Sequence, residues 1–540
     1  MSEQLKKETP SAATWGVGYW NVYFIGALLL AFYGYVNLDP LLNLLLLAAV
    51  AMPIGNRLIA CARQVLCVAA GAALLYSESW LPGIDAIMSN TGNIAQFSPS
   101  YIIQLAVDFV NPRMVGALVL LVAVYVFAKD WVRISTVSVI GLAAVALAPL
   151  WQQAMEQFAP PPAAVAVSDE PTPMGPAQVG AGTSENIEKW LASFYEFEKT
   201  RRVRFSPVQP GDTPFDVVLL NVCSLATDDL EAAGLASHPV LGRFDIRLDR
   251  YNSATSYSGP ATNRLLRSAC GQPSHTELYS GRNPDCEVMN RLEAIGFKQH
   301  LFMDHEGRFD DYITGLRNRS GLQPQLASQK GYRQLYEAFD GEPIWNTLDV
   351  LHHWRKTLES EGAARTVTLF NLVALHDGNR PVGGSKWIEF RIRAKRLLDD
   401  LDAFMDELEK SGRKVLFILV PEHGAAVRGD KIQVARLREI PSPHITRVPT
   451  MVKFFGAQGK IAPVRVTEPT SLHAVAAIIQ RTIERNFFGA QNSAAEVAEI
   501  LTDLPQTYAV SENANASVLQ FGSRYYVRMQ SSGKWIPLAQ

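Results

Sequence analysis

Five apolar segments in the N-terminal part of the chain place the strongest constraint on its fold. Each segment is close to the ~20 residues that a helix needs to cross a bilayer. The segments are Gly16–Val36, Asn37–Ile54, Leu58–Tyr76, Met114–Ala128 and Ile134–Trp151. The first is too long for a signal peptide, and no small-residue cleavage site precedes a polar mature start. We therefore expect residues 1–157 to form a membrane domain with five transmembrane helices.

The positions of the basic residues predict the orientation of this domain. They lie before the first segment, after the second, and between the fourth and fifth, as Lys6, Lys7, Arg57, Arg63, Lys129 and Arg133. Because lysine and arginine mark the cytoplasmic side of a membrane, this pattern agrees with five spans and a cytoplasmic N-terminus. The C-terminal part of the chain is then expected on the outer side.

Two features of this region leave alternatives open. The second segment carries Asp39, Pro40 and Asn43 near its start, and a chain with only four spans would have both termini on the same side. Between the third and fourth segments, Tyr101–Val110 has apolar residues at helical spacing. This pattern suits a short helix in the membrane surface, or equally an irregular loop.

The sequence changes character after residue 157. Residues 158–184 are rich in Pro, Ala and Gly, a composition typical of linkers. From residue 185 an amphipathic helix is expected first, and short apolar runs then alternate with helical patterns. The runs are Asp216–Val222, Thr366–Leu372, Lys414–Val420 and Thr450–Phe455, and the helical patterns are Leu348–Ser360, Ile388–Lys410 and Ser471–Arg485.

Strands that alternate with helices predict an α/β sheet that is buried on both faces. We therefore expect an N-terminal α-helical membrane domain, followed at 185–540 by an α/β domain that ends in a small β ribbon over Thr507–Leu538. The net charge of −2 gives no general attraction to nucleic acid.

The stretch Tyr251–His275 carries a candidate nucleophile, Ser258. It precedes Gly259-Pro260 and an amphipathic segment, and proline suits the first position of a helix. Ser258 is therefore expected just before a helix N-terminus, where free N–H groups suit a phosphate. The alternative is that Ser-Gly-Pro is only a capped helix start.

Further candidate residues follow the predicted strands, whose carboxyl ends gather ligands in open α/β sheets. Cys223 follows the first strand, His376 follows the second, and Glu422-His423 follow the third. Each alone is typical of a core or surface residue. Together, Cys223, Glu422 and His423 form a ligand set that zinc accepts, with a fourth position open for Ser258. A zinc ion there would lower the pKa of the serine hydroxyl.

Three more residues are candidates for catalysis without being metal ligands. His376 and His444 are expected to bind the phosphate or to protonate the leaving alcohol, and Arg438 is a candidate phosphate clamp. Aromatic residues that could stack on sugar rings are Trp354, Trp387 and Tyr312, although such residues more often lie in a core.

The cysteines separate into three groups. Cys61 and Cys67 lie inside the third apolar segment and are expected to act as apolar filler. Cys270 and Cys286 lie in a domain that the predicted topology places in an oxidising compartment, so we expect a disulfide that closes a short loop. Cys223 is then unpaired, and it should be either buried or bound to a metal.

The motifs around these residues resemble a known family. They are Cys223 after a strand, NSATSYSGPA around Ser258, SACGQPSH, ALHDG at His376 and PEHG at Glu422-His423. They resemble the bacterial cellulose phosphoethanolamine transferases, which are the membrane-bound G subunits encoded with cellulose synthase. The resemblance covers essentially the whole chain. It implies a zinc-dependent, alkaline phosphatase/sulfatase-like domain in the periplasm, anchored in the bacterial inner membrane.

The same resemblance implies a reaction. Phosphoethanolamine passes from phosphatidylethanolamine to Ser258, and then to the glucose C6 hydroxyl of nascent cellulose, with other subunits of the cellulose synthase complex as partners. Related lipid A transferases have threonine at the position of Ser258, glutamate at that of Cys223, and an Asp-His pair at that of Glu422-His423. The match is weaker around Arg438 and His444. A hydrolase with the same site, or a scaffold subunit, is the alternative.

Overall fold

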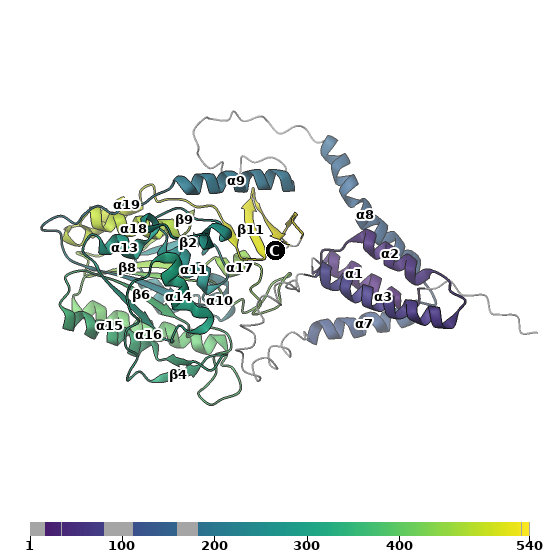
Figure 1. Ribbon diagram of the computed structural model, residues 1–540, viewed down its shortest axis with the longest axis horizontal. Coiled ribbons are helices and arrows are strands. Elements are labelled where there is room, and N and C mark those ends of the chain that lie inside the picture. Colours follow the sequence, from purple (N-terminus) through teal and green to yellow (C-terminus); the bar gives the residue numbers. More distant parts are fainter. Residues whose placement is uncertain (1–16, 34, 80–111, 159–181, 531, 539–540) are drawn as a thin grey trace, which may run out of the picture. The chain divides into compact units, whose positions relative to one another are not determined.

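The computed structural model of the 540-residue chain describes residues 17–33, 35–79, 112–158, 182–530 and 532–538. The chain divides into two compact units, of which the first holds helices α1, α2, α3, α7 and α8, and the second holds the elements from α9 to β13 (Figure 1). The predictions for Tyr101–Val110 and for most of the linker at 158–184 fall outside the described residues.

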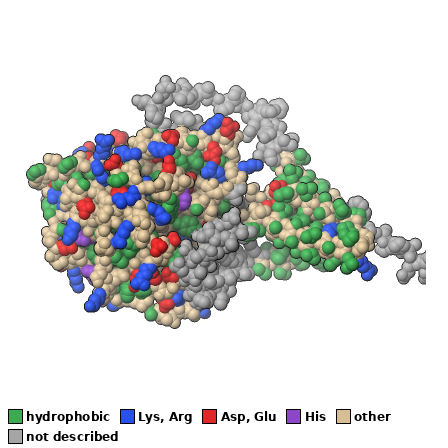
Figure 2. Space-filling view, viewed as in Figure 1, with side chains coloured by type: hydrophobic (Ala, Val, Ile, Leu, Met, Phe, Trp, Pro, Cys, Tyr) green, Lys and Arg blue, Asp and Glu red, His purple; other side chains and the backbone are tan. Residues whose placement is uncertain are grey.

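The first unit is helical at each predicted apolar segment. Its helices are α1 (Trp20–Phe32), α2 (Pro40–Ala51), α3 (Arg57–Glu78), α7 (Pro112–Ala128) and α8 (Ile134–Phe158). Apolar side chains dominate its visible surface, whereas charged side chains are spread over the second unit (Figure 2).

The length of these helices bears on the number of membrane spans. Among the described residues, α3 is the helix long and apolar enough to cross a bilayer by length and composition. Helices α1 and α2 have 13 and 12 residues, and at 1.5 Å per residue they rise only about 20 Å and about 18 Å. A hydrocarbon core is ~30 Å thick, so the five-span topology stays a prediction.

Polar residues at the start of the second apolar segment have structural partners. The Asp39 carboxylate accepts N–H groups from the first turn of α2. The Asn43 amide donates to Glu78 Oε1 at 2.5 Å, and the Asp39 backbone N–H donates to the same oxygen at 2.9 Å. These bonds tie the start of α2 to the end of α3, which explains why polar side chains occur in this otherwise apolar segment.

The second unit is built on a seven-stranded sheet with the order β3-β6-β1-β7-β8-β2-β9. The strands are β1 (Asp216–Val222), β2 (Ile246–Tyr251), β3 (Lys298–Met303), β6 (Thr366–Leu372), β7 (Val415–Pro421), β8 (Thr450–Phe455) and β9 (Val464–Thr470). All neighbouring pairs are parallel except those that involve β8, which is antiparallel to both β7 and β2. The carboxyl ends of β1, β2, β6 and β7 therefore meet at one edge.

Helices cover both faces of this sheet because successive strand residues point to opposite faces. Val217 and Leu219 belong to one core, with α11 (Ser258–Leu266) and α18 (Leu472–Glu484). Val218 and Leu220 belong to the other core, with α15 (Thr347–Glu361) and α16 (Phe390–Ser411). The predicted fold class, an α-helical N-terminal part followed by an α/β domain, is confirmed.

A second, four-stranded antiparallel sheet forms the C-terminal part of the second unit. It consists of β10 (Val510–Glu512), β11 (Ala516–Phe521), β12 (Arg524–Met529) and β13 (Trp535–Pro537), as the predicted C-terminal ribbon requires. Its apolar face packs against α9 (Ser184–Thr200) through Trp190 and Phe194. The other elements include α10 (Thr227–Ala232), α12 (His275–Tyr279), α13 (Val288–Glu293), α14 (Tyr312–Ser320), α17 (Pro443–Thr446), α19 (Ser493–Leu501) and a hairpin of β4 (Gln334–Glu337) and β5 (Pro343–Trp345).

Three strands of the main sheet were not predicted from the sequence. β3 and β9 are edge strands, and β2 is the neighbour of β9. β9 even contains Pro469, which a strand tolerates at an edge because one side of its ladder is unpaired. β2 and β9 contain partly exposed polar residues, and β3 contains the buried polar residues Gln299 and His300, so these strands lack the continuous apolar run that identifies a central strand.

The predicted disulfide between Cys270 and Cys286 is present and joins residues 16 apart. Cys223 and Cys67 are free and buried, and Cys61 is free and exposed. The disulfide closes a loop that begins just after α11, the helix that carries Ser258.

Replacing both disulfide cysteines with serine should lower the free energy of unfolding by about 3 kcal/mol, because a loop of this length gains that much conformational entropy in the unfolded chain. Urea unfolding of the full-length protein in detergent measures the change. Reductant should destabilise the wild type but leave the double variant unaffected. Equal stability of both proteins under oxidising conditions would contradict this expectation.

Candidate active site

The candidate residues meet at the carboxyl edge of the main sheet. Cys223 directly follows β1, and Glu422 and His423 directly follow β7. Ser258 is the first residue of α11, with Tyr257 as its N-cap. We expected Ser258 just before the helix and Pro260 at its first position. The helix instead starts at Ser258, and Pro260 lies within the first turn, where a missing N–H costs no helical hydrogen bond.

Cys223, Ser258 and His423 are in mutual contact. Cys223 Sγ lies 3.4 Å from Ser258 Oγ and 3.8 Å from His423 Nε2. Ser258 Oγ lies 3.2 Å from the same His423 nitrogen. The ligand atoms of Cys223, Glu422 and His423 all lie within 4.8 Å of one another. Cys223, Glu422 and His423 are buried, whereas Ser258 is half-buried and so remains open to a substrate.

One oxygen of Glu422 is held by a buried polar network. Asn371 Nδ2 donates to Glu422 Oε1 at 2.5 Å, and the hydroxyls of Thr262 and Tyr312 lie 3.1 Å and 3.4 Å from that oxygen. Asn371 is oriented in turn by His305, whose Nε2–H donates to its carbonyl oxygen at 2.8 Å. The network fixes the carboxylate so that Oε2 is the oxygen left for another partner.

The imidazole of His423 presents a lone pair to the cluster. Its Nδ1–H donates to the Gly424 carbonyl at 2.9 Å, which leaves Nε2 unprotonated and directed at Cys223 and Ser258. Burial and the charge of Arg438 hold the pKa of His423 well below its usual range. A neutral imidazole with a free Nε2 is the form that binds a metal ion.

The ligand atoms of Cys223, Glu422 and His423 are suited to bind a divalent cation, because none of them can donate a hydrogen bond to another in its metal-binding form. Glu422 Oε2 is buried without a hydrogen-bond partner, and the nearby atoms of the cluster, Cys223 Sγ and His423 Nε2, are acceptors in their metal-binding forms. Burial and the Glu422 charge raise the pKa of Cys223 to about 12. A buried thiolate and a buried carboxylate side by side need a compensating positive charge, and sulfur, nitrogen and oxygen ligands together suit zinc.

The loop after His423 is fixed by Asp229 of α10. The Asp229 carboxylate accepts N–H groups from Ala226 at 2.9 Å, Ala425 at 2.6 Å and Val427 at 3.0 Å. A Cβ on Gly424 would lie 2.6 Å from the Ala226 Cβ, so a larger residue at 424 would displace this loop. The glycine of the PEHG motif is therefore required by packing.

Arg438, the candidate phosphate clamp, lies beside the cluster. Its Nη1 donates to the Ser224 hydroxyl at 3.0 Å and lies 3.4 Å from His423 Nδ1. The guanidinium therefore provides positive charge next to the atoms that would hold a phosphate.

His376 follows β6 and is held by its backbone. Its Nδ1–H donates to the Asp377 carbonyl at 2.8 Å, and its own carbonyl accepts from Arg393 Nη1 at 2.7 Å. Burial and nearby Arg438 lower the pKa of His376 to about 3. The side chain is therefore neutral at physiological pH, with Nε2 as a proton acceptor.

His444 is not brought into contact with the cluster. It lies on α17 with its side chain 46% exposed, and its Nδ1 is 3.5 Å from Asp228 Oδ1. The hydrogen bond to Asp228 raises its pKa. That His444 binds the phosphate or protonates the leaving alcohol therefore stays a prediction.

Several residues that shape the site were not predicted from the sequence. Asn221 and Asn371 are opposite each other in register, and each is a polar residue in an otherwise apolar strand. That pattern is a signal, because a buried amide needs partners. Asp229, Thr262 and His305 offer no comparable signal, since their roles depend on contacts between distant segments.

The three aromatic residues considered for stacking on sugar rings contact other parts of the protein. Trp354 is fully buried in the core and donates to Thr368, so that interpretation is wrong for Trp354. Tyr312 faces Glu422. The Arg436 guanidinium lies over the Trp387 ring, 4.1 Å from its centroid.

Asn371→Ala should lower the affinity for zinc about 10- to 100-fold, because residues that orient a metal ligand typically have effects of this size. Competition with a chromophoric chelator measures the affinity. The matched control is Asn263→Ala, since Asn263 is equally buried but pairs with Ser320 rather than with Glu422. A zinc affinity of the Asn371 variant within twofold of wild type would show that this amide does not orient Glu422.

Comparisons with known proteins place the chain in a family. It is 40% identical to the cellulose biosynthesis protein BcsG of Salmonella typhimurium (strain LT2), with 97% of each chain covered. It is 39% identical to BcsG of Escherichia coli (strain K12), again over 97% of both chains.

Solved structures show more remote similarity. An alkaline phosphatase superfamily protein from Vibrio parahaemolyticus is 14% identical, with 64% of this chain and 90% of that chain covered and a TM-score of 0.45. The lipooligosaccharide phosphoethanolamine transferase A of Neisseria meningitidis is 11% identical, with 85% and 94% covered and a TM-score of 0.38.

Family models cover most of the chain. Residues 20–147 match the N-terminal domain, and residues 172–535 match the C-terminal domain, of the cellulose biosynthesis protein BcsG. Together with the sequence relatives, these matches show that the chain belongs to the BcsG family of cellulose biosynthesis proteins.

Proposed function

We propose that this protein transfers phosphoethanolamine from phosphatidylethanolamine to the glucose C6 hydroxyl of nascent cellulose, through a covalent intermediate on Ser258. The observation that carries the proposal is the contact of a half-buried serine hydroxyl with a buried Cys-Glu-His cluster at the carboxyl edge of the sheet. A serine in that position can attack phosphorus, and the open face in front of it can receive two different alcohols in turn.

In the first step, Ser258 Oγ attacks the phosphorus of the lipid. The Oγ–P bond forms, the bond from phosphorus to the glycerol oxygen breaks, and the serine proton passes to that oxygen, which leaves as diacylglycerol. In the second step, the C6 hydroxyl oxygen of a glucose unit attacks the same phosphorus. The Oγ–P bond then breaks, and the proton returns to Ser258.

Cys223, Glu422 and His423 would hold the zinc ion. When bound, zinc lowers the pKa of a hydroxyl that it contacts and offsets the negative charge of a phosphate. The chain itself supplies the rest of the site. Arg438 faces the phosphate oxygens with a fixed positive charge, and the neutral His376 accepts and returns the transferred proton at Nε2.

Membership of the family supports a polysaccharide as the acceptor, and the sequence supports a location in the inner membrane. Relatives over nearly the whole chain are cellulose biosynthesis proteins, which favours a polysaccharide acceptor. The charge pattern around the apolar segments favours an inner-membrane protein with five spans, a cytoplasmic N-terminus and a periplasmic catalytic domain at 185–540. Such an anchor would bring the enzyme to a lipid donor and to a polymer that emerges at the same membrane face. Other subunits of the cellulose synthase complex are the expected partners.

Intact mass spectrometry of the full-length protein in phosphatidylethanolamine nanodiscs with zinc tests the intermediate. We expect a phosphoethanolamine adduct that maps to Ser258 and is absent in Ser258→Ala. The matched control is Ser268→Ala, which removes a buried hydroxyl just beyond the other end of α11 and should leave the adduct unchanged.

The fate of the adduct separates the proposed function from its alternatives. Addition of a cellulose oligomer should discharge the enzyme and label the sugar, as a transferase requires. Discharge to water at the same rate with and without the oligomer would indicate a hydrolase. A zinc-loaded wild type that never forms the adduct would indicate a scaffold subunit.

His376→Gln should lower kcat/KM by about 10²- to 10⁴-fold, the usual effect of losing a positioned proton-transfer group. The ratio of wild type to variant should stay constant between pH 5 and 8. A pKa of about 3 keeps His376 neutral throughout this window, and it would gain a proton only as the pH falls toward 3. A limb of the wild-type profile near pH 6.5 that is lost in the variant would show that His376 titrates at its ordinary pKa.

A further inference from the structure

The short loop that leads to Ser258 adopts an unfavourable backbone conformation. It runs from Asn252 to Tyr257, between β2 and α11. Ala254, which is fully buried, has a φ of 63°, a left-handed conformation that residues with a Cβ rarely adopt. Such a conformation persists only where the surroundings hold it in place, so the loop depends on its neighbours.

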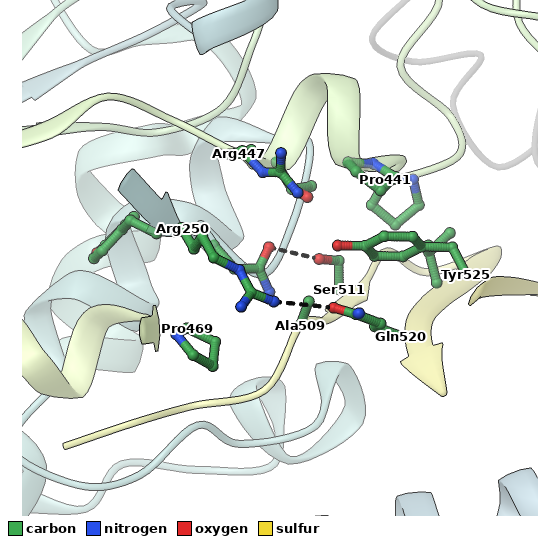
Figure 3. A pocket seen from close by; sticks show the side chains of 13 residues that line it. Arg250, Pro441, Arg447, Pro469, Ala509, Ser511, Gln520 and Tyr525 are labelled. Atoms are coloured by element: carbon green, nitrogen blue, oxygen red, sulfur yellow. Dashed lines mark hydrogen bonds between the residues drawn. The ribbon is translucent and has the colours of Figure 1, made fainter. Parts of the chain in front are cut away.

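Those neighbours belong largely to the C-terminal sheet, which lies far from the loop in the sequence. The Glu512 backbone N–H donates to the Ala254 carbonyl at 3.0 Å, and Asn252 Nδ2 donates to the Val510 carbonyl at 2.9 Å. The Ser511 hydroxyl donates to Asn252 Oδ1 at 2.9 Å, one of the bonds drawn in Figure 3. The same figure shows Ser511, Gln520 and Tyr525 of this sheet beside Arg250 of β2.

Asn513 makes the densest set of contacts with the loop. Its Oδ1 accepts from the Thr255 hydroxyl at 2.8 Å and from the Ser256 backbone N–H at 3.3 Å. Its Nδ2 donates to the Ser256 hydroxyl oxygen at 2.6 Å. The orientation of the amide is unambiguous, because Ser256 N–H can only donate. Ser256 is two residues before the candidate nucleophile.

The same amide also holds the segment that carries Arg438. Asn513 Nδ2 donates to the Glu439 carbonyl at 2.9 Å and lies 3.4 Å from the Arg438 carbonyl. The Ser256 hydroxyl donates to that Arg438 carbonyl at 2.5 Å. One buried side chain, only 2% exposed, therefore joins the loop before Ser258 to the backbone of Arg438.

The carboxylate of Glu439 adds a second link between the same segments. It accepts from the Tyr257 hydroxyl at 2.7 Å and from Asn515 Nδ2 at 2.7 Å. Tyr257 is the N-cap residue of α11, so this link reaches the residue directly before Ser258. Both links start from the turn between β10 and β11.

We propose that Asn513 is a positioning residue, through which the C-terminal sheet sets the placement of Ser258 relative to Arg438. This inference rests on the proposed function, because it concerns the nucleophile and the phosphate clamp of that reaction. Among the described residues, no hydrogen bond joins the Asn513 side chain to Ser258 or to Cys223, Glu422 and His423. Asn513 acts through Ser256 and through the backbone of Arg438 and Glu439.

Asn513→Asp tests the proposal with little change in shape. The carboxylate keeps an acceptor for Thr255 and Ser256 N–H but can no longer donate, and it faces the Glu439 carbonyl oxygen. The matched control is Ser517→Ala. Ser517 is equally buried in the same sheet, but its hydroxyl pairs with Glu512 rather than with the loop.

Hydrogen exchange on the full-length, zinc-loaded protein gives the first readout. We expect amides of residues 253–258 and of residues 436–440 to exchange at least about tenfold faster in Asn513→Asp, as the loss of buried hydrogen bonds implies. Amides of β1 and β7 should keep their protection, and Ser517→Ala should match the wild type. Unchanged exchange in either segment, or faster exchange throughout the sheet, would overturn the proposal.

The rate of adduct formation on Ser258 gives the second readout. We expect it to fall about 10- to 100-fold in Asn513→Asp, since small displacements of reacting groups have effects of this size, with KM for the lipid and zinc content unchanged. Adduct formation at the wild-type rate in a variant with loosened segments would refute a positioning role. If the wild type itself forms no adduct, the proposed function fails, and hydrogen exchange alone decides whether Asn513 couples the two segments.

Discussion

The candidate active site depends on the placement of three buried side chains, all of types that can bind a metal, at one edge of a sheet. Cys223, Glu422 and His423 are almost completely excluded from water, and a buried thiolate and carboxylate repel each other unless a cation lies between them. The register of β1 and β7, with Val222 opposite Pro421, brings the three residues together. Ser258, the first residue of α11, is brought to the same place by the loop that follows β2.

The hydrogen bonds around the cluster distinguish the two oxygens of Glu422 from each other, and likewise the two nitrogens of His423. The two oxygens of Glu422 differ because Asn371 donates a hydrogen bond to Oε1, whereas Oε2 has no hydrogen-bond partner among the described residues. The two nitrogens of His423 differ because Nδ1–H donates a hydrogen bond to the Gly424 carbonyl, whereas Nε2 carries no proton. Each orientation is fixed by a neighbour that is itself held, so the cluster is organised before any ligand binds. Preorganisation of this kind reduces the reorganisation that a reaction step requires.

Much of the fold and the core of the site could be predicted from the sequence. The four central strands are apolar runs, which identify them without knowledge of their neighbours. Cys223, Glu422-His423 and His376 are recognisable because they follow such strands. The outer strands β2, β3 and β9 were missed because polar residues interrupt each of them, partly exposed ones in β2 and β9 and the buried Gln299 and His300 in β3. The start of α11 was misplaced by two residues, at Pro260 instead of Ser258, since proline is tolerated throughout the first turn.

The sequence alone therefore determined the alternation of strands and helices, the apolar N-terminal helices, the disulfide pair and the three residues that meet in the cluster. These properties depend on local patterns of polarity and on residue types. The tertiary structure decided which oxygen of Glu422 is free, that His444 pairs with Asp228, and that Asn513 holds the loop before Ser258. Such contacts join segments that are far apart in the chain, and only the packing of the whole domain brings them within hydrogen-bonding distance.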